Sequence, residues 1–357
     1  ALSGCHPNNH TPLLWNMSRM KTDVVYLQEK KLQNAAMGKN FLRYFNIDGR
    51  VVLDGYHIVK TSLKEVSYKL DDISFKYTGH KKVDLTPKAL FKKLTQGPAE
   101  RGEVAAYCIQ DCRLVFTLFS SLHTQLSMVE MSRVSRTSWK DIMTKGQQIK
   151  SFNLIVHEAY DKYVINDSVL KTIRTGTYTG AIVIDPRKGF YTENDGYGIV
   201  LDFASLYPSI IQEMNLCYST LVLPDRRDTP TRLKKTLMDT HPDALRSCKI
   251  NDSTEYVYAK PVCCEGILPK ILVSLLSRRK QAKRDMKHAT TDTLREIQNR
   301  RQLALKVTAN SLYGFTGVKY GILPCKPIAA TVTHRGRCLI DYTMQMIKDI
   351  QIGRAHV

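Results

Sequence analysis

Hydrophobic and polar positions change their spacing sharply near the middle of the chain. The apolar run at residues 198–201 has the length and composition of a buried strand, and Asp202 directly follows it. Pro208 and Ser209 favour the start of a helix, which leaves backbone N–H groups free to meet anionic oxygens. Because a carboxylate at the end of a buried strand is costly unless a cation or a donor satisfies it, the pattern predicts a site for a metal ion and a phosphate group. The alternative is an Asp that only caps the helix.

Two long helices are predicted further along the chain. Apolar residues have helical spacing from residue 271, and we expect this helix to end near residue 288. Residues 293–312 contain neither Pro nor Gly, and Thr293 with Glu296 has the spacing of a capping box. A short polar link joins the two segments, so they should form an antiparallel pair.

Both predicted helices carry polar stripes. On the second, Lys306, Asn310 and Tyr313 lie at positions i, i+4 and i+7, which places them on one face over about 10 Å. On the first, a run of basic side chains is interrupted by a single acid, Asp285. The basic residues are Arg278, Arg279, Lys280, Lys283, Arg284 and Lys287. Taken singly, the basic residues would usually form a solvated helix face, the Asn would cap a helix, and the Tyr would pack in the core.

Two strings make these patterns specific. Residues 202–211, DFASLYPSII, resemble motif A of family B DNA polymerases, and residues 306–314, KVTANSLYG, resemble motif B of the same family in the same order. Arg279 and Lys283 match the R-x-x-x-K pattern of that family. The resemblance implies an α/β multidomain fold: a truncated RNase H-like 3′–5′ exonuclease domain, then an α+β polymerase palm with helical fingers. It leans toward herpesvirus-like and other large DNA virus enzymes, and toward eukaryotic delta-like ones.

The resemblance also implies a reaction. A primer 3′-hydroxyl would attack the α-phosphate of a dNTP, with two Mg²⁺ ions stabilising the attacking and leaving oxygens. Asp202 would bridge both ions, and the backbone carbonyl of Phe203 would complete the metal shell. The amides of Ser205 and Leu206 would meet the phosphates.

Further nucleotide contacts are implied on the fingers side. Four residues would neutralise the triphosphate: Arg279, Lys283, Lys306 and Asn310. Asp202 and Lys306 are expected to be the catalytic residues of the polymerase site. Tyr207 would exclude a ribose 2′-hydroxyl, and Tyr313 and Gly314 would lie along the nascent base pair.

Two shorter strings resemble other parts of the same family. Tyr107 and Asp111 match the Y-x-x-x-D of the exonuclease motif Exo III, so Asp111 would hold a divalent ion while Tyr107 orients the attacking water. Asp54 is expected to be structural. Tyr178 and Gly180 match a Y-x-G-G/A element that contacts the template strand and couples synthesis to editing, although a plain turn before a strand at 182–184 explains them nearly as well.

The resemblance divides the chain into consecutive segments. They are the C-terminal part of the exonuclease domain (1–140), a linker and the start of the palm (141–195), the palm with motif A and a variable insertion at 224–261 (196–262), the fingers pair with motif B (263–316), the truncated continuation of the palm (317–351), and a last segment (352–357). Residues 352–357 match the translation of a common sequencing adapter, and we expect them not to be protein sequence. The family's motif C and Exo I do not occur in the chain, so we expect this fragment to be inactive alone. The alternative is a catalytically degenerate polymerase-like protein that binds DNA.

The amino-acid composition indicates which partners the protein binds. Fifty-three Lys and Arg against 33 Asp and Glu give a net charge of +20 over 357 residues, which favours a polyanion such as primer–template DNA. No apolar run approaches the length of a membrane span, so we expect no membrane partner. Nine cysteines without a C-x-x-C pair indicate a reducing, intracellular compartment. The resemblance implies that this compartment is the host nucleus or a viral replication site. The resemblance adds dNTPs and a processivity factor.

Overall fold

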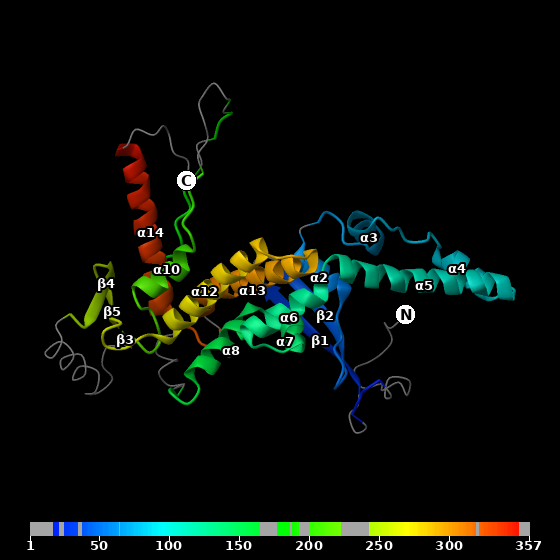
Figure 1. Ribbon diagram of the computed structural model, residues 1–357, viewed down its shortest axis with the longest axis horizontal. Coiled ribbons are helices and arrows are strands. Elements are labelled where there is room, and N and C mark those ends of the chain that lie inside the picture. Colours follow the sequence, from blue (N-terminus) through cyan, green and yellow to red (C-terminus); the bar gives the residue numbers. More distant parts are fainter. Residues whose placement is uncertain are drawn as a thin grey trace. The chain divides into compact units, whose positions relative to one another are not determined.

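The computed structural model describes residues 17–20, 25–34, 38–63, 65–164, 177–185, 188–190, 192, 200–222, 243–318 and 321–349 (Figure 1). Two compact units divide the chain. The first comprises Ala1–Arg133 and Thr137–Gly146, and the second comprises Val134–Arg136 and Gln147–Val357. The segment boundaries expected from the sequence remain predictions, and residues 352–357 lie outside the described part.

The first unit begins with a β-hairpin followed by helices. Strands β1 (Tyr26–Asn34) and β2 (Gly38–Asn46) pair antiparallel. The helices are α2 (Gly55–Ser62), α3 (Leu70–Thr78), α4 (Pro87–Leu94), α5 (Pro98–Ser121), α6 (Thr124–Ser135), which continues into the second unit, and α7 (Trp139–Thr144). Local sequence sets their ends: Gly79 closes α3 in the left-handed conformation, and Thr86 caps α4 just before a proline.

Two small hydrophobic clusters hold the helices of the first unit together. Ile58, Met128 and Met143 join α2, α6 and α7. A second cluster of buried apolar side chains joins α2, α3 and α5, and consists of Val59, Ile73 and Leu118. Asp54 accepts hydrogen bonds from the backbone N–H groups of Tyr56 and His57, so it caps α2 and its predicted structural role is confirmed.

The second unit is built around long helices. They are α8 (Gln147–Ala159), α10 (Leu206–Glu213), α12 (Ile267–Lys287), α13 (Asp292–Gly317) and α14 (Lys326–Asp349). Helices α12 and α13 lie side by side, in yellow and orange in Figure 1, and a short link reverses the chain between them. The predicted antiparallel pair is therefore confirmed. Its core comes from Leu268 and Leu272 of α12 and from Leu305 and Leu312 of α13, which are fully buried.

The start of α13 differs from the prediction. Thr291, not Thr293, is the N-cap, and its side chain accepts a hydrogen bond from the backbone N–H of Leu294. The hydroxyl of Thr291 sits three residues before its bonded amide, the geometry of a cap, while Thr293 already lies inside the helix. The capping-box assignment was therefore wrong by two residues, although the helix itself was predicted.

A three-stranded antiparallel sheet accompanies these helices, in the order β3–β5–β4. The strands are β3 (Leu221–Val222), β4 (Leu245–Asn251) and β5 (Thr254–Ala259). Part of the expected insertion at 224–261 is thus a β-hairpin that is tied to the core, because the buried Tyr258 hydroxyl lies 3.0 Å from that of Thr331 in α14. The sequence analysis found no element there.

Two predicted strands are absent from the described residues. Val200 and Leu201 belong to no strand and are 93% and 58% exposed, and residues 182–184 are also outside any sheet. The rest of the first run, 198–199, lies outside the described part. A strand forms only when a neighbouring strand pairs with it, and the described residues supply none at either place. The mixed α/β class is confirmed, while the specific domain arrangement remains a prediction.

A buried asparagine joins three parts of the second unit. Asn215 follows α10 with a positive φ of 53° and is 1% exposed. Its Nδ2 donates to the carbonyl oxygens of Ala259 and Cys264, at 2.8 and 2.9 Å, and its Oδ1 accepts from the N–H of Gly266 at 2.9 Å. The end of α10, the end of β5 and the start of α12 are therefore fixed to one another.

Candidate active site

The loop before α10 exposes the candidate metal ligands. Asp202 and Phe203 lie in exposed, irregular backbone, and Ser205 caps α10 with a φ of 58°. The Ser205 side chain makes no capping hydrogen bond, so it does not occupy the amides of the first turn. Leu206 is the first helical residue, so α10 begins two residues before the start predicted at Pro208 and Ser209.

Tyr207 and Tyr313 bring the two long motifs into contact. Their ring centroids are 4.4 Å apart, with the ring planes tilted by 45°. Burial raises the pKa of the Tyr313 phenol, and the neighbouring Tyr178 hydroxyl, which is hydrogen-bonded to it, raises this pKa further. Tyr178, Tyr207 and Tyr313, which are remote in sequence, therefore form one aromatic cluster, named the tyrosine cluster below.

Helix α14 supports this cluster with residues that the sequence analysis did not single out. Arg337 Nη1 donates to the carbonyl oxygens of Thr179 and Gly180, at 3.0 and 2.5 Å. Thr333 Oγ1 also donates to the Thr179 carbonyl, at 2.9 Å. These bonds go to backbone acceptors, which carry no side-chain pattern, so the only signal in the sequence was the match at Tyr178 and Gly180.

Two glycines make room for the tyrosine rings. A Cβ at Gly336 would lie 3.1 Å from Cε1 of Tyr207, and one at Gly317 would collide with the Tyr178 hydroxyl. By contrast, a Cβ at Gly180 or Gly314 would meet no atom within 4 Å. Close approach therefore explains Gly317 and Gly336, whereas steric crowding does not explain the two glycines that the motifs contain.

The candidate triphosphate ligands all lie on the α12–α13 pair. Lys283, Lys306 and Asn310 are exposed. Arg279 is half-buried, and its buried Nε has no hydrogen-bond partner in the described part of the chain. Within that part, these four residues make no hydrogen bond or ion pair with Asp202, so their convergence on one nucleotide remains a prediction.

The described residues supply only part of a metal site. Asp202 offers one exposed carboxylate, and the described residues contain no cluster of three or more His, Cys, Asp or Glu side chains that could hold an ion. Because Mg²⁺ in such sites is bound by more than one carboxylate or phosphate oxygen, this donor set is incomplete by itself. The binding of two Mg²⁺ ions at Asp202 thus remains a prediction.

In the first unit, the predicted exonuclease pair lies on one face of α5 beside a lysine. Lys82 Nζ is 3.2 Å from Asp111 Oδ2 and 5.2 Å from the Tyr107 ring centroid. The second carboxylate oxygen, Asp111 Oδ1, is buried without a partner among the described residues. An orphaned buried carboxylate oxygen suits a cation ligand, but the described residues form no group of three or more His, Cys, Asp or Glu side chains with Asp111, so the binding of a divalent ion there remains a prediction. The sequence analysis did not identify Lys82.

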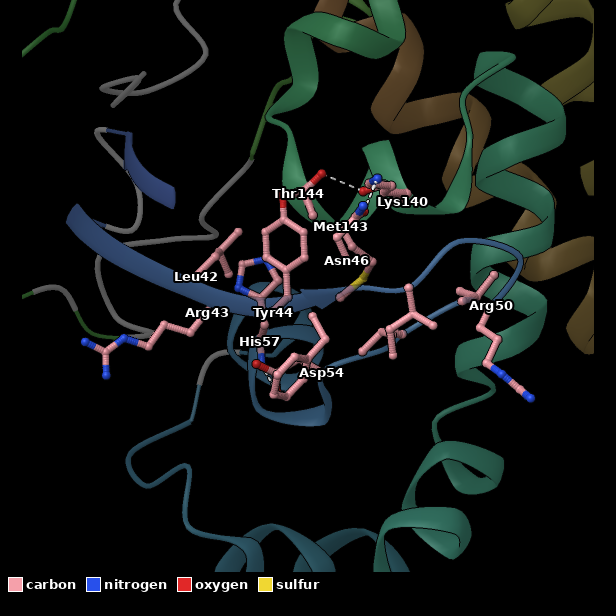
Figure 2. Close-up of a pocket in the computed structure, with 14 residues that line it drawn as sticks. Leu42, Arg43, Tyr44, Asn46, Arg50, Asp54, His57, Lys140, Met143 and Thr144 are labelled. Carbon is pink, nitrogen blue, oxygen red and sulfur yellow. Dashed lines mark hydrogen bonds between the residues drawn. The ribbon is translucent and has the colours of Figure 1, made fainter. Parts of the chain in front are cut away.

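A separate pocket of about 180 Å³ opens between β2, α2 and α7. Figure 2 shows Arg43 and Arg50 extending away from it, while Asn46, Lys140 and Thr144 are joined by hydrogen bonds. Its lining includes neither Tyr107 nor Asp111. The pocket is therefore distinct from the predicted exonuclease pair.

Among the described residues, no helix has the length and apolar character that a membrane span requires.

Comparisons with known proteins identify the family of the chain. The model of the family described as DNA polymerase family B matches residues 137–356. The DNA polymerase delta catalytic subunit of Drosophila melanogaster is 35% identical over 332 residues, which cover 93% of this chain and 29% of that protein. The DNA polymerase catalytic subunit of human herpesvirus 8 is 33% identical over 345 residues, covering 96% of this chain and 33% of that protein.

These findings define the class of protein. The chain is a member of DNA polymerase family B. It spans about a third of the length of the relatives it matches. The similarity to cellular and viral relatives is nearly equal.

Proposed function

We propose that the protein to which this chain belongs carries out template-directed DNA synthesis. It would transfer a nucleotide from a dNTP to the 3′-hydroxyl of a primer annealed to template DNA. The observation that carries the proposal is the contact between Tyr207 and Tyr313, with ring centroids 4.4 Å apart, because it brings motif A and motif B to one place.

Residues of α10 and of the α12–α13 pair would bind different parts of the dNTP triphosphate. The amides of Ser205 and Leu206 would donate to phosphate oxygens at the start of α10, where the helix dipole also favours an anion. The exposed Lys283 and Lys306 and the amide of Asn310 would neutralise the triphosphate from the fingers. Arg279, whose buried Nε lacks a partner among the described residues, would gain one from a phosphate.

A bound divalent metal would stabilise the attacking and leaving oxygens. Asp202 and the carbonyl of Phe203 would supply part of its shell. Tyr207 would exclude a ribose 2′-hydroxyl, and Tyr313 with Gly314 would lie along the new base pair. The partners of the whole protein would be primer–template DNA, dNTPs and a processivity factor, at a nuclear or viral replication site.

Steady-state kinetics of primer extension by the full-length gene product tests the triphosphate ligands. Lys283→Ala and Lys306→Ala should each raise KM for dNTP by about tenfold or more, since a charge-assisted hydrogen bond contributes about 1.5–3 kcal/mol. Lys280→Ala is the matched control, because it removes the same charge from a neighbour on α12. Equal KM values in all three variants would rule out the proposed binding of the triphosphate by Lys283 and Lys306.

A second activity, 3′–5′ exonuclease, is favoured by the cluster around Asp111. The carboxylate has one oxygen beside Lys82 and the other buried without a partner in the described part, so it is poised for a cation. Tyr107 would orient the attacking water. Degradation of single-stranded DNA should be lost in Asp111→Asn and kept in Glu103→Gln, which neutralises an exposed carboxylate on the same helix. Unchanged degradation by Asp111→Asn would refute this second activity.

A further inference from the structure

The segment that carries Tyr178 depends on α14 for its position. Residues 177–181 form neither helix nor strand, so no backbone ladder fixes them. Their carbonyls accept hydrogen bonds from Arg337, which reaches both Thr179 and Gly180, and from Thr333. Charge-assisted bonds of this kind are roughly twice as strong as neutral ones, so Arg337 is the main anchor.

The anchored segment in turn touches the ring that contacts Tyr207. The Tyr178 hydroxyl is hydrogen-bonded to Tyr313 and also fills the space that the missing side chain of Gly317 leaves open. Tyr313 packs on Tyr207, and the Tyr207 ring also lies close to Gly336, the residue just before Arg337. A displacement of the segment would therefore remove support from the Tyr207 ring on the side of Tyr313.

We propose that Arg337 is a positioning residue for sugar selectivity: it anchors Thr179 and Gly180 to α14, and thereby holds the tyrosine cluster in the arrangement that excludes a ribonucleotide. Arg337 touches no substrate in this account. The inference rests on the proposed role of Tyr207 in the polymerase site, and it assigns a selectivity role to a residue outside both motifs.

The test compares single-nucleotide insertion by the full-length gene product. For each variant, kcat/KM is measured for a dNTP and for the matching rNTP opposite the same template base. The variants are Arg337→Gln, Arg337→Lys, Thr333→Val, Tyr207→Ala and the control Arg335→Gln. Arg335 is exposed and lies two residues away on the same helix, so its variant removes an equal charge without the anchor.

Arg337→Gln should lower the dNTP over rNTP selectivity by about tenfold, which is the lower end of the discrimination that a fit differing by one methylene gives in a binding pocket. The change should come mainly from better use of the rNTP, with little loss of kcat for the dNTP. Arg337→Lys should restore part of the selectivity, and Thr333→Val should show a smaller loss. Arg335→Gln should behave as the parent protein.

The outcomes separate the inference from the function on which it rests. If Tyr207→Ala leaves selectivity unchanged, the proposed role of Tyr207 fails and the inference fails with it. If Tyr207→Ala lowers selectivity but Arg337→Gln and Thr333→Val do not, only the inference fails. A second measurement does not depend on activity. In protein labelled with 3-fluorotyrosine, the ¹⁹F resonance of residue 313 should shift both in Arg337→Gln and in Tyr178→Phe. An unchanged resonance in Arg337→Gln would overturn the proposed anchoring.

Discussion

Asn215 offers a sharp test of how the second unit is held together. Asn215→Ala would remove two donors from buried carbonyl groups and the acceptor of the Gly266 N–H. An unsatisfied buried backbone group costs about 1–3 kcal/mol, and the two carbonyls keep a second lone pair, so we take a value near the lower end for each. The three losses together amount to about 3 kcal/mol.

The backbone conformation adds a further cost in the same variant. Asn215 has a φ of 53°, which Asn tolerates better than Ala, and this adds about 1 kcal/mol. Asn215→Ala should therefore lower the free energy of unfolding by about 4 kcal/mol, a large part of the roughly 5–15 kcal/mol typical of a domain. Asn215→Gly should lose only about 3 kcal/mol, because glycine adopts the positive φ freely.

Guanidinium unfolding followed by two probes measures these differences. Far-UV circular dichroism reports the helices of both units, whereas the two tryptophans, at positions 15 and 139, both belong to the first unit. The loss of helix signal from the second unit should move to lower denaturant in Asn215→Ala, and the fluorescence transition should stay in place. A change below about 1 kcal/mol, or a glycine variant less stable than the alanine variant, would refute the reasoning.

Three further predictions concern a buried lysine, two glycines of α13 and the net positive charge. Desolvation lowers the pKa of Lys150, which is 5% exposed, from 10.5 to about 8. Both folded and unfolded states are protonated below pH 8, where the buried charge is most unfavourable. Lys150→Met should therefore stabilise the protein by about 3 kcal/mol at pH 7, and the gain should vanish as the pH rises from about 8 to 10.5. Denaturant unfolding at pH 7 and pH 10.5 measures this, and a variant no more stable than the parent at pH 7 would contradict it. Gly317→Ala should lose about 1–3 kcal/mol through collision with the Tyr178 hydroxyl, whereas Gly314→Ala, on the same helix with open space, should be neutral or stabilising; thermal melting distinguishes them. Duplex DNA affinity should fall by about a thousandfold between 50 and 200 mM salt, as for proteins that contact several phosphates, and fluorescence anisotropy titrations that show no salt dependence would contradict the charge argument.

The helical parts of the site could be predicted from the sequence because their signals are local. The spacing of apolar residues predicted the α12–α13 pair, and Pro208 and Ser209 predicted α10 with a start two residues later than the observed Leu206. The faces of these helices follow from the period of 3.6 residues, so Lys306, Asn310 and Tyr313 could be grouped from their spacing alone.

The remaining features depend on partners that are distant in the chain. Strand β5 pairs with β3 across the insertion, and no local pattern specifies that register. Lys82 reaches Asp111 from the loop between α3 and α4, and Arg337 bonds to backbone carbonyls of a segment far upstream. Long side chains and backbone acceptors leave no periodic signal, which is why sequence reasoning missed both.

The central claim is tested most directly by one primer-extension measurement. The full-length gene product and its Asp202→Asn variant are given a labelled primer–template, all dNTPs and Mg²⁺, and the extended product is followed with time. The account predicts extension by the parent protein and its loss in Asp202→Asn, with DNA binding retained in both. Undiminished extension by Asp202→Asn would contradict the account, and binding without extension by the parent protein would identify a polymerase-like DNA-binding protein instead.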